Sequence, residues 1–167
     1  MLENCYYIKE QYFIDHDDYI KLLDPQNLDK QSKRTYLCVC IQVYNKNFYI
    51  PLRNNLGESL KKYGRIGHSV PSTKRPNAGL DYRYSLIIDN PIYLEKHIFP
   101  KLPNSQYIKL HNDYDTIVKE FTTYLRGFIK ACYKNRVHWE PLYRESSLIN
   151  YCDELKTLYV PKDSVQN

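Results

Sequence analysis

The chain has 167 residues, of which 43% are hydrophobic and 26% charged, which is ordinary usage for a globular protein. This balance excludes disordered, collagen-like and coiled-coil chains, and the length favours one domain over residues 1–167. The net charge of +5 is unevenly distributed, because residues 30–83 carry eleven basic side chains against two acidic ones, whereas residues 1–29 carry two against seven. No apolar run reaches the roughly 18 residues of a membrane span, and the N-terminus lacks the pattern of a signal peptide.

The first half of the chain predicts a strand, a helix and a β-hairpin. Residues 5–8 form an aromatic run that favours a strand, and the apolar spacing over residues 10–23 favours a helix. Residues 35–44, rich in β-branched and aromatic side chains, and residues 48–52 predict a hairpin with a turn at 45–47. Because Pro51 cannot donate a backbone hydrogen bond, its strand should lie at a sheet edge or break there.

The second half predicts one strand and two helices after a long loop. Residues 54–79 contain glycines, prolines and basic residues, which favours an excursion from the core. Residues 79–89 then predict a strand, residues 111–134 a long helix with one apolar stripe, and residues 141–155 a further helix. The tail after residue 161 is polar and is expected to fray. These elements indicate an α+β fold, with a central antiparallel sheet flanked by several helices.

Cysteine and histidine usage gives no sign of a cofactor. The five cysteines, Cys5, Cys38, Cys40, Cys132 and Cys152, are an odd number in a chain without an export signal. We therefore expect free thiols in a reducing cytoplasm. Neither the cysteines nor the five histidines have the spacing of a metal site, so no metal or other cofactor is expected.

The basic segment 30–83 is the main functional signal. Concentrated positive charge favours a polyanionic partner such as RNA, because each neutralised phosphate releases counterions. The sequence has no phosphate-binding glycine loop and no nucleophile elbow. A cationic surface can still assist RNA cleavage without a metal, because the 2′-hydroxyl attacks its own phosphate and Arg or Lys stabilises the developing charge. The same segment also fits a non-catalytic RNA-binding module, or a protein-interaction domain whose basic face is incidental.

Two stretches of the sequence resemble a known family. Residues 33–55 combine a basic residue, a hydrophobic strand, a short turn and a strand that ends in Pro51-Leu52. Residues 79–88 carry Gly-Leu-Asp-Tyr before another hydrophobic strand. This order resembles the toxins of type III toxin–antitoxin systems, the endoribonucleases of the ToxN, AbiQ, CptN and TenpN kind. The resemblance extends over nearly the whole chain, because a long helix and a shorter C-terminal helix follow in the same order.

The resemblance implies both a fold and an activity. The fold would be a twisted antiparallel sheet related to the Kid/MazF toxins, with added helices. The activity would be that of a bacterial, cytoplasmic endoribonuclease that cleaves cellular or phage mRNA at adenine-rich sites without a metal. The toxin would be inhibited by a repeat-derived RNA pseudoknot, which it trims itself and holds in a closed toxin–RNA assembly.

The resemblance also implies candidate catalytic residues around the hairpin. Arg53 follows the Pro-Leu step and would stabilise the phosphorane, while Asn54 or Asn55 would orient a phosphate oxygen or the 2′-hydroxyl. The ToxN branch has hydroxyl residues and a lysine in these places, so the resemblance does not assign the individual catalytic roles here. Arg34 or Lys33 matches the family's basic residue before the hairpin and would contact the scissile phosphate; the alternative is a solvated charge.

Further candidates lie outside the hairpin. Tyr12 occupies the place of a family tyrosine near the active site, although a core position fits it equally. His68 would act as acid or base, since histidine exchanges protons near neutral pH, or would contact RNA. Tyr82 and Arg83 are candidate RNA contacts, and Arg83 is equally a candidate ion-pair partner of Asp81. The other basic residues predicted to line a groove for the antitoxin RNA are Lys61, Lys62, Arg65, Lys74 and Arg75.

Overall fold

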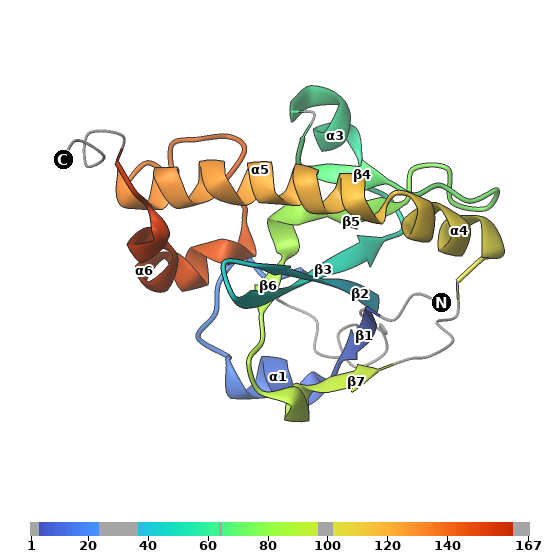
Figure 1. Cartoon of the computed structure of the whole chain (residues 1–167), viewed down its shortest axis with the longest axis horizontal. Coiled ribbons are helices and arrows are strands. Elements are labelled where there is room, and N and C mark those ends of the chain that lie inside the picture. The colour runs from blue at the N-terminus through green and yellow to red at the C-terminus, as the bar shows by residue number, and fades with distance from the viewer. Residues whose placement is uncertain (1–3, 24–36, 64, 97–101, 162–167) are drawn as a thin grey trace.

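A computed structural model of the chain describes residues 4–23, 37–63, 65–96 and 102–161 (Figure 1). Its centre is a seven-stranded antiparallel sheet with the order β4-β5-β3-β2-β1-β7, in which β6 pairs with β3. The strands are β1 (Cys5–Ile8), β2 (Leu37–Val43), β3 (Lys46–Arg53), β4 (Gly67–Ser69), β5 (Gly79–Asp81), β6 (Leu86–Ile87) and β7 (Leu94–Lys96). The expected α+β architecture with an antiparallel sheet is confirmed.

Helices cover the sheet, and the long helix α5 lies across one face of it (Figure 1). In the part of the chain that the structure describes, the α-helices are α1 (Glu10–Asp15), α3 (Glu58–Tyr63), α4 (Asn104–Asn112), α5 (Tyr114–Tyr133) and α6 (Cys152–Leu155). The 3₁₀ turns of the same residues are η1 (Tyr82–Tyr84), η2 (Pro91–Tyr93), η3 (Ser147–Tyr151) and η4 (Lys156–Leu158). In the described ranges, no helix has the length and apolar character needed to cross a membrane.

The predicted apolar stripe of the long helix is confirmed as core. Phe121 of α5 packs against Phe48 of β3, with 5.2 Å between the ring centroids. The six stripe residues are all buried: Ile117, Phe121, Tyr124, Leu125, Phe128 and Cys132. The helix itself begins at Tyr114, and the separate helix α4 precedes it, so the predicted start at residue 111 is wrong.

The predicted hairpin is confirmed, but its turn lies earlier than residues 45–47. Val43 pairs with Lys46, which leaves Tyr44 and Asn45 as a two-residue turn. Both turn residues have positive φ, 52° and 59°, as a type I′ turn requires to match the twist of its strands.

Pro51 lies inside the sheet and not at its edge. On one side it pairs with Cys38 of β2. On the other side, β3 changes partner from β6 at Tyr49 to β5 at Leu52. The ladder on that side is interrupted at the proline, where a missing N–H costs least.

Helix α1 is shorter than the sequence predicts because the chain after it binds the C-terminal segment. The backbone of Ile20 makes two hydrogen bonds with the side chain of Asn150, at 2.9 and 2.8 Å. The Lys21 carbonyl accepts a hydrogen bond from Ser147 Oγ at 2.6 Å, and Lys21 has φ +56°, which no helix allows. Contacts distant in sequence thus replace the helical ones.

Residues 54–79 contain more structure than the predicted loop, namely α3 and the edge strand β4. A Cβ at Gly79 would collide with the carbonyl oxygen of His68, and one at Gly67 with that of Leu80. These glycines therefore permit the close approach of β4 and β5, whereas in the sequence they suggest only a flexible loop.

Two other predicted elements are divided. The strand over residues 79–89 is interrupted by η1, because the Asp81 carboxylate accepts a hydrogen bond from Arg83 N and caps that turn. The helix over residues 141–155 is replaced by η3 and α6, and Ser146 caps η3 through the N–H of Leu148.

Two cysteines form a disulfide, which corrects the expectation of five free thiols. Cys132 at the end of α5 is bonded to Cys152 of α6, whereas Cys5, Cys38 and Cys40 are free. The C-terminal segment returns to α5 and brings the two sulfurs together, a long-range contact that cysteine counting does not show.

We expect reduction of this disulfide to lower the free energy of unfolding by about 3 kcal/mol, because the bond closes a loop with a sequence separation of 20 residues. Denaturant unfolding with and without reductant measures the difference. The variant C132S/C152S should match the reduced protein and be insensitive to reductant. Identical unfolding midpoints for the reduced and oxidised protein would contradict this role.

Candidate functional site

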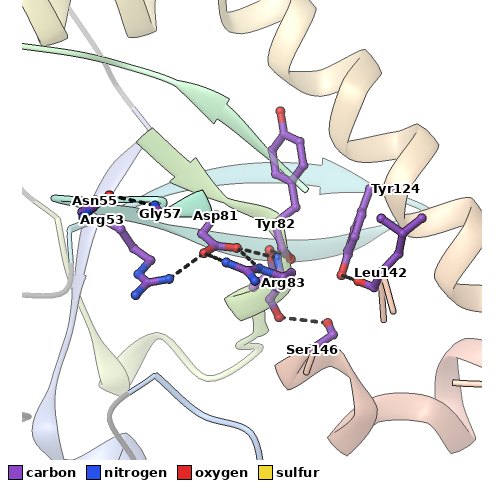
Figure 2. Close-up of polar contacts among 10 residues, drawn as sticks. Arg53, Asn55, Gly57, Asp81, Tyr82, Arg83, Tyr124, Leu142 and Ser146 are labelled. Carbon is purple, nitrogen blue, oxygen red and sulfur yellow. Dashed lines mark hydrogen bonds and ion pairs between the residues drawn. The ribbon is translucent and has the colours of Figure 1, made fainter. Parts of the chain in front are cut away.

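A buried carboxylate holds two arginines at the end of β3 (Figure 2). The Asp81 side chain is fully buried, and its Oδ2 accepts hydrogen bonds from Arg53 Nη1 at 2.9 Å and from Arg83 Nη2 at 2.8 Å. Its Oδ1 accepts from Arg83 Nε at 2.9 Å. Strand pairing explains the arrangement, because Arg53 lies opposite Gly79, two residues before Asp81 on β5. The three side chains together carry one net positive charge.

Tyr84, which was not among the predicted site residues, completes this cluster. The guanidinium carbons of Arg53 and Arg83 lie 5.2 and 5.4 Å from the centroid of its ring, within the range of cation–π attraction. The Tyr-Arg-Tyr run is the signal that could have indicated Tyr84, because a 3₁₀ turn over that run brings the ring beside both arginines.

The two arginines differ in accessibility and therefore in role. The Arg83 side chain is 11% exposed, and its guanidinium binds Asp81 bidentately. Of its two predicted roles, RNA contact and ion-pair partner of Asp81, the structure therefore favours the ion pair. Burial opposes the charge of Arg83, but the hydrogen bonds and charge of Asp81 outweigh it and raise the pKa of Arg83. The Arg53 side chain is 28% exposed and uses one nitrogen for Asp81, so its other N–H groups can bind an external anion.

Polar and basic side chains surround Arg53 at this end of the sheet. Asn54 and Asn55 are exposed directly after it, and Asn55 Oδ1 accepts a hydrogen bond from Gly57 N at 2.7 Å (Figure 2). The loop between β4 and β5 lies alongside, because Leu56 N donates to Asn77 O at 2.8 Å.

Basic residues of the predicted groove lie at both ends of β5. Lys74 and Arg75 are exposed in the loop that leads into β5 beside Asn54 and Asn55. Arg65 is exposed just before β4, near the other end of β5. Lys62 is exposed on α3, and Lys61 is a residue of the same helix. Lys33 and Arg34 lie outside the described residues.

His68 lies on the opposite face of the sheet from Arg53. In the register, Leu52, Leu80 and His68 are aligned across three strands, so alternation directs His68 toward α5 and Arg53 away from it. Its Nδ1 is 2.8 Å from Glu120 Oε2, and its Nε2 is 2.9 Å from Asp113 Oδ2. His68 is therefore separated from Arg53 by the sheet, and both of its ring nitrogens face carboxylates.

Two tyrosines of the predicted site are core residues. Tyr82 is fully buried and its hydroxyl donates to Glu120 Oε2 at 2.7 Å, so its ring is not available to stack on a base. Tyr12 is also buried; its hydroxyl lies 2.6 Å from that of Tyr151, and burial raises its pKa. The predicted RNA contact of Tyr82 and the predicted catalytic role of Tyr12 are therefore corrected to packing roles.

The His68 cluster predicts a pH dependence of stability. Hydrogen bonds from Lys109 and His68 lower the pKa of Asp113 below its usual value. A lowered carboxyl pKa stabilises the fold above the unfolded-state pKa of about 3.9, and this contribution disappears as the pH falls through the folded-state pKa. We expect Asp113→Asn to lower the free energy of unfolding at neutral pH, with a difference that shrinks below about pH 4.

Urea denaturation at a series of pH values measures this difference. The matched control is Asp17→Asn, because Asp17 is exposed and has no ion-pair partner within the described ranges. A destabilisation by Asp113→Asn that stays constant from neutral to strongly acidic pH would contradict the pairing.

The described ranges contain no group of three His, Cys, Asp or Glu side chains suited to a metal ion. Around His68, the two carboxylates face the ring nitrogens directly, and these contacts occupy both nitrogens. Beside Arg53, the partly exposed guanidinium and the exposed amide side chains offer anion binding and charge stabilisation.

Comparison with known proteins finds a structural relative. No family model matches the chain, and no curated protein matches it. A solved structure from a study of bacterial type III toxin–antitoxin systems, in which a non-coding RNA pseudoknot selectively inhibits the toxin, superposes with a TM-score of 0.57. The match covers 92% of this chain and 97% of the other at 13% sequence identity. It confirms, at the level of the fold, the resemblance to type III toxins that the sequence indicates.

Proposed function

We propose that this protein is an endoribonuclease toxin of a type III toxin–antitoxin system, formed by a single domain and inhibited by an RNA pseudoknot. The observation that carries the proposal is the structural match over nearly the full length of both chains. The resemblance of the hairpin and of the Gly-Leu-Asp-Tyr run, which was inferred from the sequence alone, points to the same family. A relation of the sheet to the Kid/MazF toxins belongs to the same proposal.

The proposed reaction uses Arg53 to stabilise charge. The 2′-hydroxyl of the substrate attacks the adjacent phosphate, the P–O5′ bond breaks, and the products carry a 2′,3′-cyclic phosphate and a 5′-hydroxyl. The N–H groups of Arg53 that do not bind Asp81 donate to the phosphorane oxygens, and Asp81 fixes the direction of its guanidinium. Asn54 and Asn55 orient the phosphate or the 2′-hydroxyl, and Lys33 or Arg34 contributes a further cation. No step of this reaction requires a metal.

The proposed partners are RNAs of two kinds. Adenine-rich sites of cellular or phage mRNA are the substrate, and the repeat-derived pseudoknot is both processed and bound in a closed toxin–RNA assembly. The exposed basic residues at both ends of β5 supply a surface that follows a phosphate backbone on either side of Arg53. The toxin acts in the bacterial cytoplasm.

A second candidate function is a non-catalytic RNA-binding module. One observation favours it. His68 and Tyr12, two of the predicted catalytic residues, make their hydrogen bonds away from Arg53. The ionisable residues described beside Arg53 are Asp81, Arg83 and Tyr84. Asp81 already accepts hydrogen bonds from both arginines, so it is not a free carboxylate that could act as general base.

Incubation of the purified protein with adenine-rich RNA in excess chelator separates the two functions. The toxin predicts fragments that end in a 2′,3′-cyclic phosphate, and it predicts resistance of a substrate with a 2′-deoxy residue at the cleavage site. Salt-dependent binding without cleavage would overturn the enzyme and leave the binding module. The absence of both binding and cleavage would overturn both functions.

A further inference from the structure

A second site lies at the other end of β3 from Arg53. A hollow of about 410 Å³ opens between the C-terminal half of α5, the β2–β3 turn and the residues after η4. Its volume falls within the range of small-molecule sites, roughly 300–1,000 Å³. The strand from Lys46 to Arg53 separates the two places by roughly 23 Å, at about 3.3 Å per residue. The hollow is therefore distinct from the Arg53 cluster.

The lining of the hollow combines a buried apolar base with two tyrosines. Ile129 of α5 is 3% exposed and forms part of the base. Tyr159 lines one part of the wall and packs on Tyr133, with 4.5 Å between the ring centroids, so its position is fixed by a neighbour. Tyr44 lines another part from the hairpin turn, and its side chain is 43% exposed. Such rings offer flat apolar surface to a planar ligand.

Two basic side chains, Arg126 and Lys130, also line the hollow. Arg126 and Lys130 are four residues apart on α5, so they are neighbours on one face of the helix, and both are exposed. Neither has an ion-pair partner within the described ranges. Like charges at this spacing repel each other, and an anion between them would relieve the repulsion.

The hairpin turn fixes the backbone of Tyr44 beside the hollow. Its φ of 52° lies in the left-handed region, which costs a bulky residue on the order of 1 kcal/mol. Asn or Gly would fill this turn position with less strain. The strained backbone holds a half-exposed ring at the wall of the hollow, where the ring does not contribute to the core.

We propose that the hollow binds one nucleotide, with its base against Tyr44 and Tyr159 and its phosphate on Arg126 and Lys130. Stacking on aromatic rings and pairing with guanidinium and ammonium groups together select a planar ring that carries a phosphate. A free mononucleotide and a nucleotide within an RNA chain share this chemistry. Nucleotide binding in the hollow does not require cleavage at Arg53. A negative result for the hollow would therefore leave the proposed function intact, and the reverse also holds.

The test uses protein carrying Arg53→Ala, so that RNA probes stay intact, and follows binding by amide chemical shifts. The probes are adenosine 5′-monophosphate, adenosine, and a short adenine oligonucleotide. We expect saturable shifts around the hollow with the monophosphate and at least tenfold weaker binding in R126Q/K130Q. Adenosine should bind more weakly and be insensitive to that double variant, because it lacks the phosphate.

Two variants sharpen the result. Tyr44→Asn keeps a residue suited to the turn and should weaken both monophosphate and adenosine, whereas Lys119→Gln, an exposed lysine elsewhere on α5, should change neither. Binding of the monophosphate alone identifies a free nucleotide as the source, and binding of only the oligonucleotide, weakened by R126Q/K130Q, identifies RNA. Absence of saturable shifts with every probe, or equal affinities in R126Q/K130Q and its parent, would overturn the site.

Discussion

Replacing Arg53 by alanine should abolish toxicity and reduce RNA cleavage by about 10²- to 10³-fold, the usual effect of removing one donor that stabilises transition-state charge. The reason is that Arg53 is the more exposed arginine of the cluster, 28% against 11%, and donates to Asp81 through a single nitrogen, whereas Arg83 uses two. The loss should fall on the rate of bond cleavage more than on RNA affinity, because the basic residues beside β5 remain. Single-turnover cleavage and growth upon expression measure the two effects.

The fold should survive this change. Without Arg53, the buried Asp81 carboxylate keeps its two hydrogen bonds to the Arg83 guanidinium, so no buried charge is left unpaired. The matched control is Arg136→Ala, which removes an exposed arginine paired with Glu140 and should leave cleavage unchanged. A folded Arg53→Ala protein that retains full cleavage and toxicity would refute the assignment of Arg53.

Replacing Asp81 by alanine should lower the free energy of unfolding by about 3–5 kcal/mol, the usual effect of breaking a buried ion pair from one side. The change leaves the guanidinium of Arg83 almost fully buried without its carboxylate and removes the cap of η1. Cleavage by the remaining folded protein should also fall, because Arg53 loses the partner that fixes its direction. Denaturant unfolding and single-turnover cleavage at low temperature separate the two losses.

A surface carboxylate provides the comparison for Asp81. Asp153 pairs with Lys156, but its side chain is 97% exposed, so Asp153→Ala should leave the unfolding midpoint within experimental error. The more conservative change Asp81→Asn keeps the volume and an acceptor, and it should fall between wild type and Asp81→Ala. If Asp81→Ala unfolds at the wild-type midpoint, then the carboxylate does not hold the cluster together.

Local sequence patterns predicted those elements that local physics determines. The hairpin follows from two runs of β-branched and aromatic residues, and the long helix follows from an apolar stripe that begins near Ile117. The secondary-structure predictions were wrong where contacts between residues distant in sequence determine the backbone conformation. The bonds of Ile20 to Asn150 end α1 early, and the disulfide at Cys132 fastens the C-terminal segment.

The candidate site was predicted in part for the same reason. The resemblance carried by Pro51-Leu52 indicated Arg53, and the ion pair with Asp81 was one of the two predicted roles of Arg83, which the structure confirms. Charge alone could not reveal that His68 faces the other side of the sheet, because its side follows from the register of β4 with β5. Burial of Tyr82 likewise depends on α5, whose Glu120 accepts its hydroxyl bond.

The hydrogen bond from Ser146 Oγ to the Arg83 carbonyl, 2.9 Å long, ties the arginine cluster to the C-terminal segment (Figure 2). Both arginines and the carboxylate between them come from residues 53–83, yet their support includes a residue more than sixty positions later. A chain cut before residue 140 would contain the whole cluster and should still be inactive. Under the proposed function, adding the missing C-terminal fragment in trans should restore activity, and a nascent chain should become toxic only when translation is almost complete.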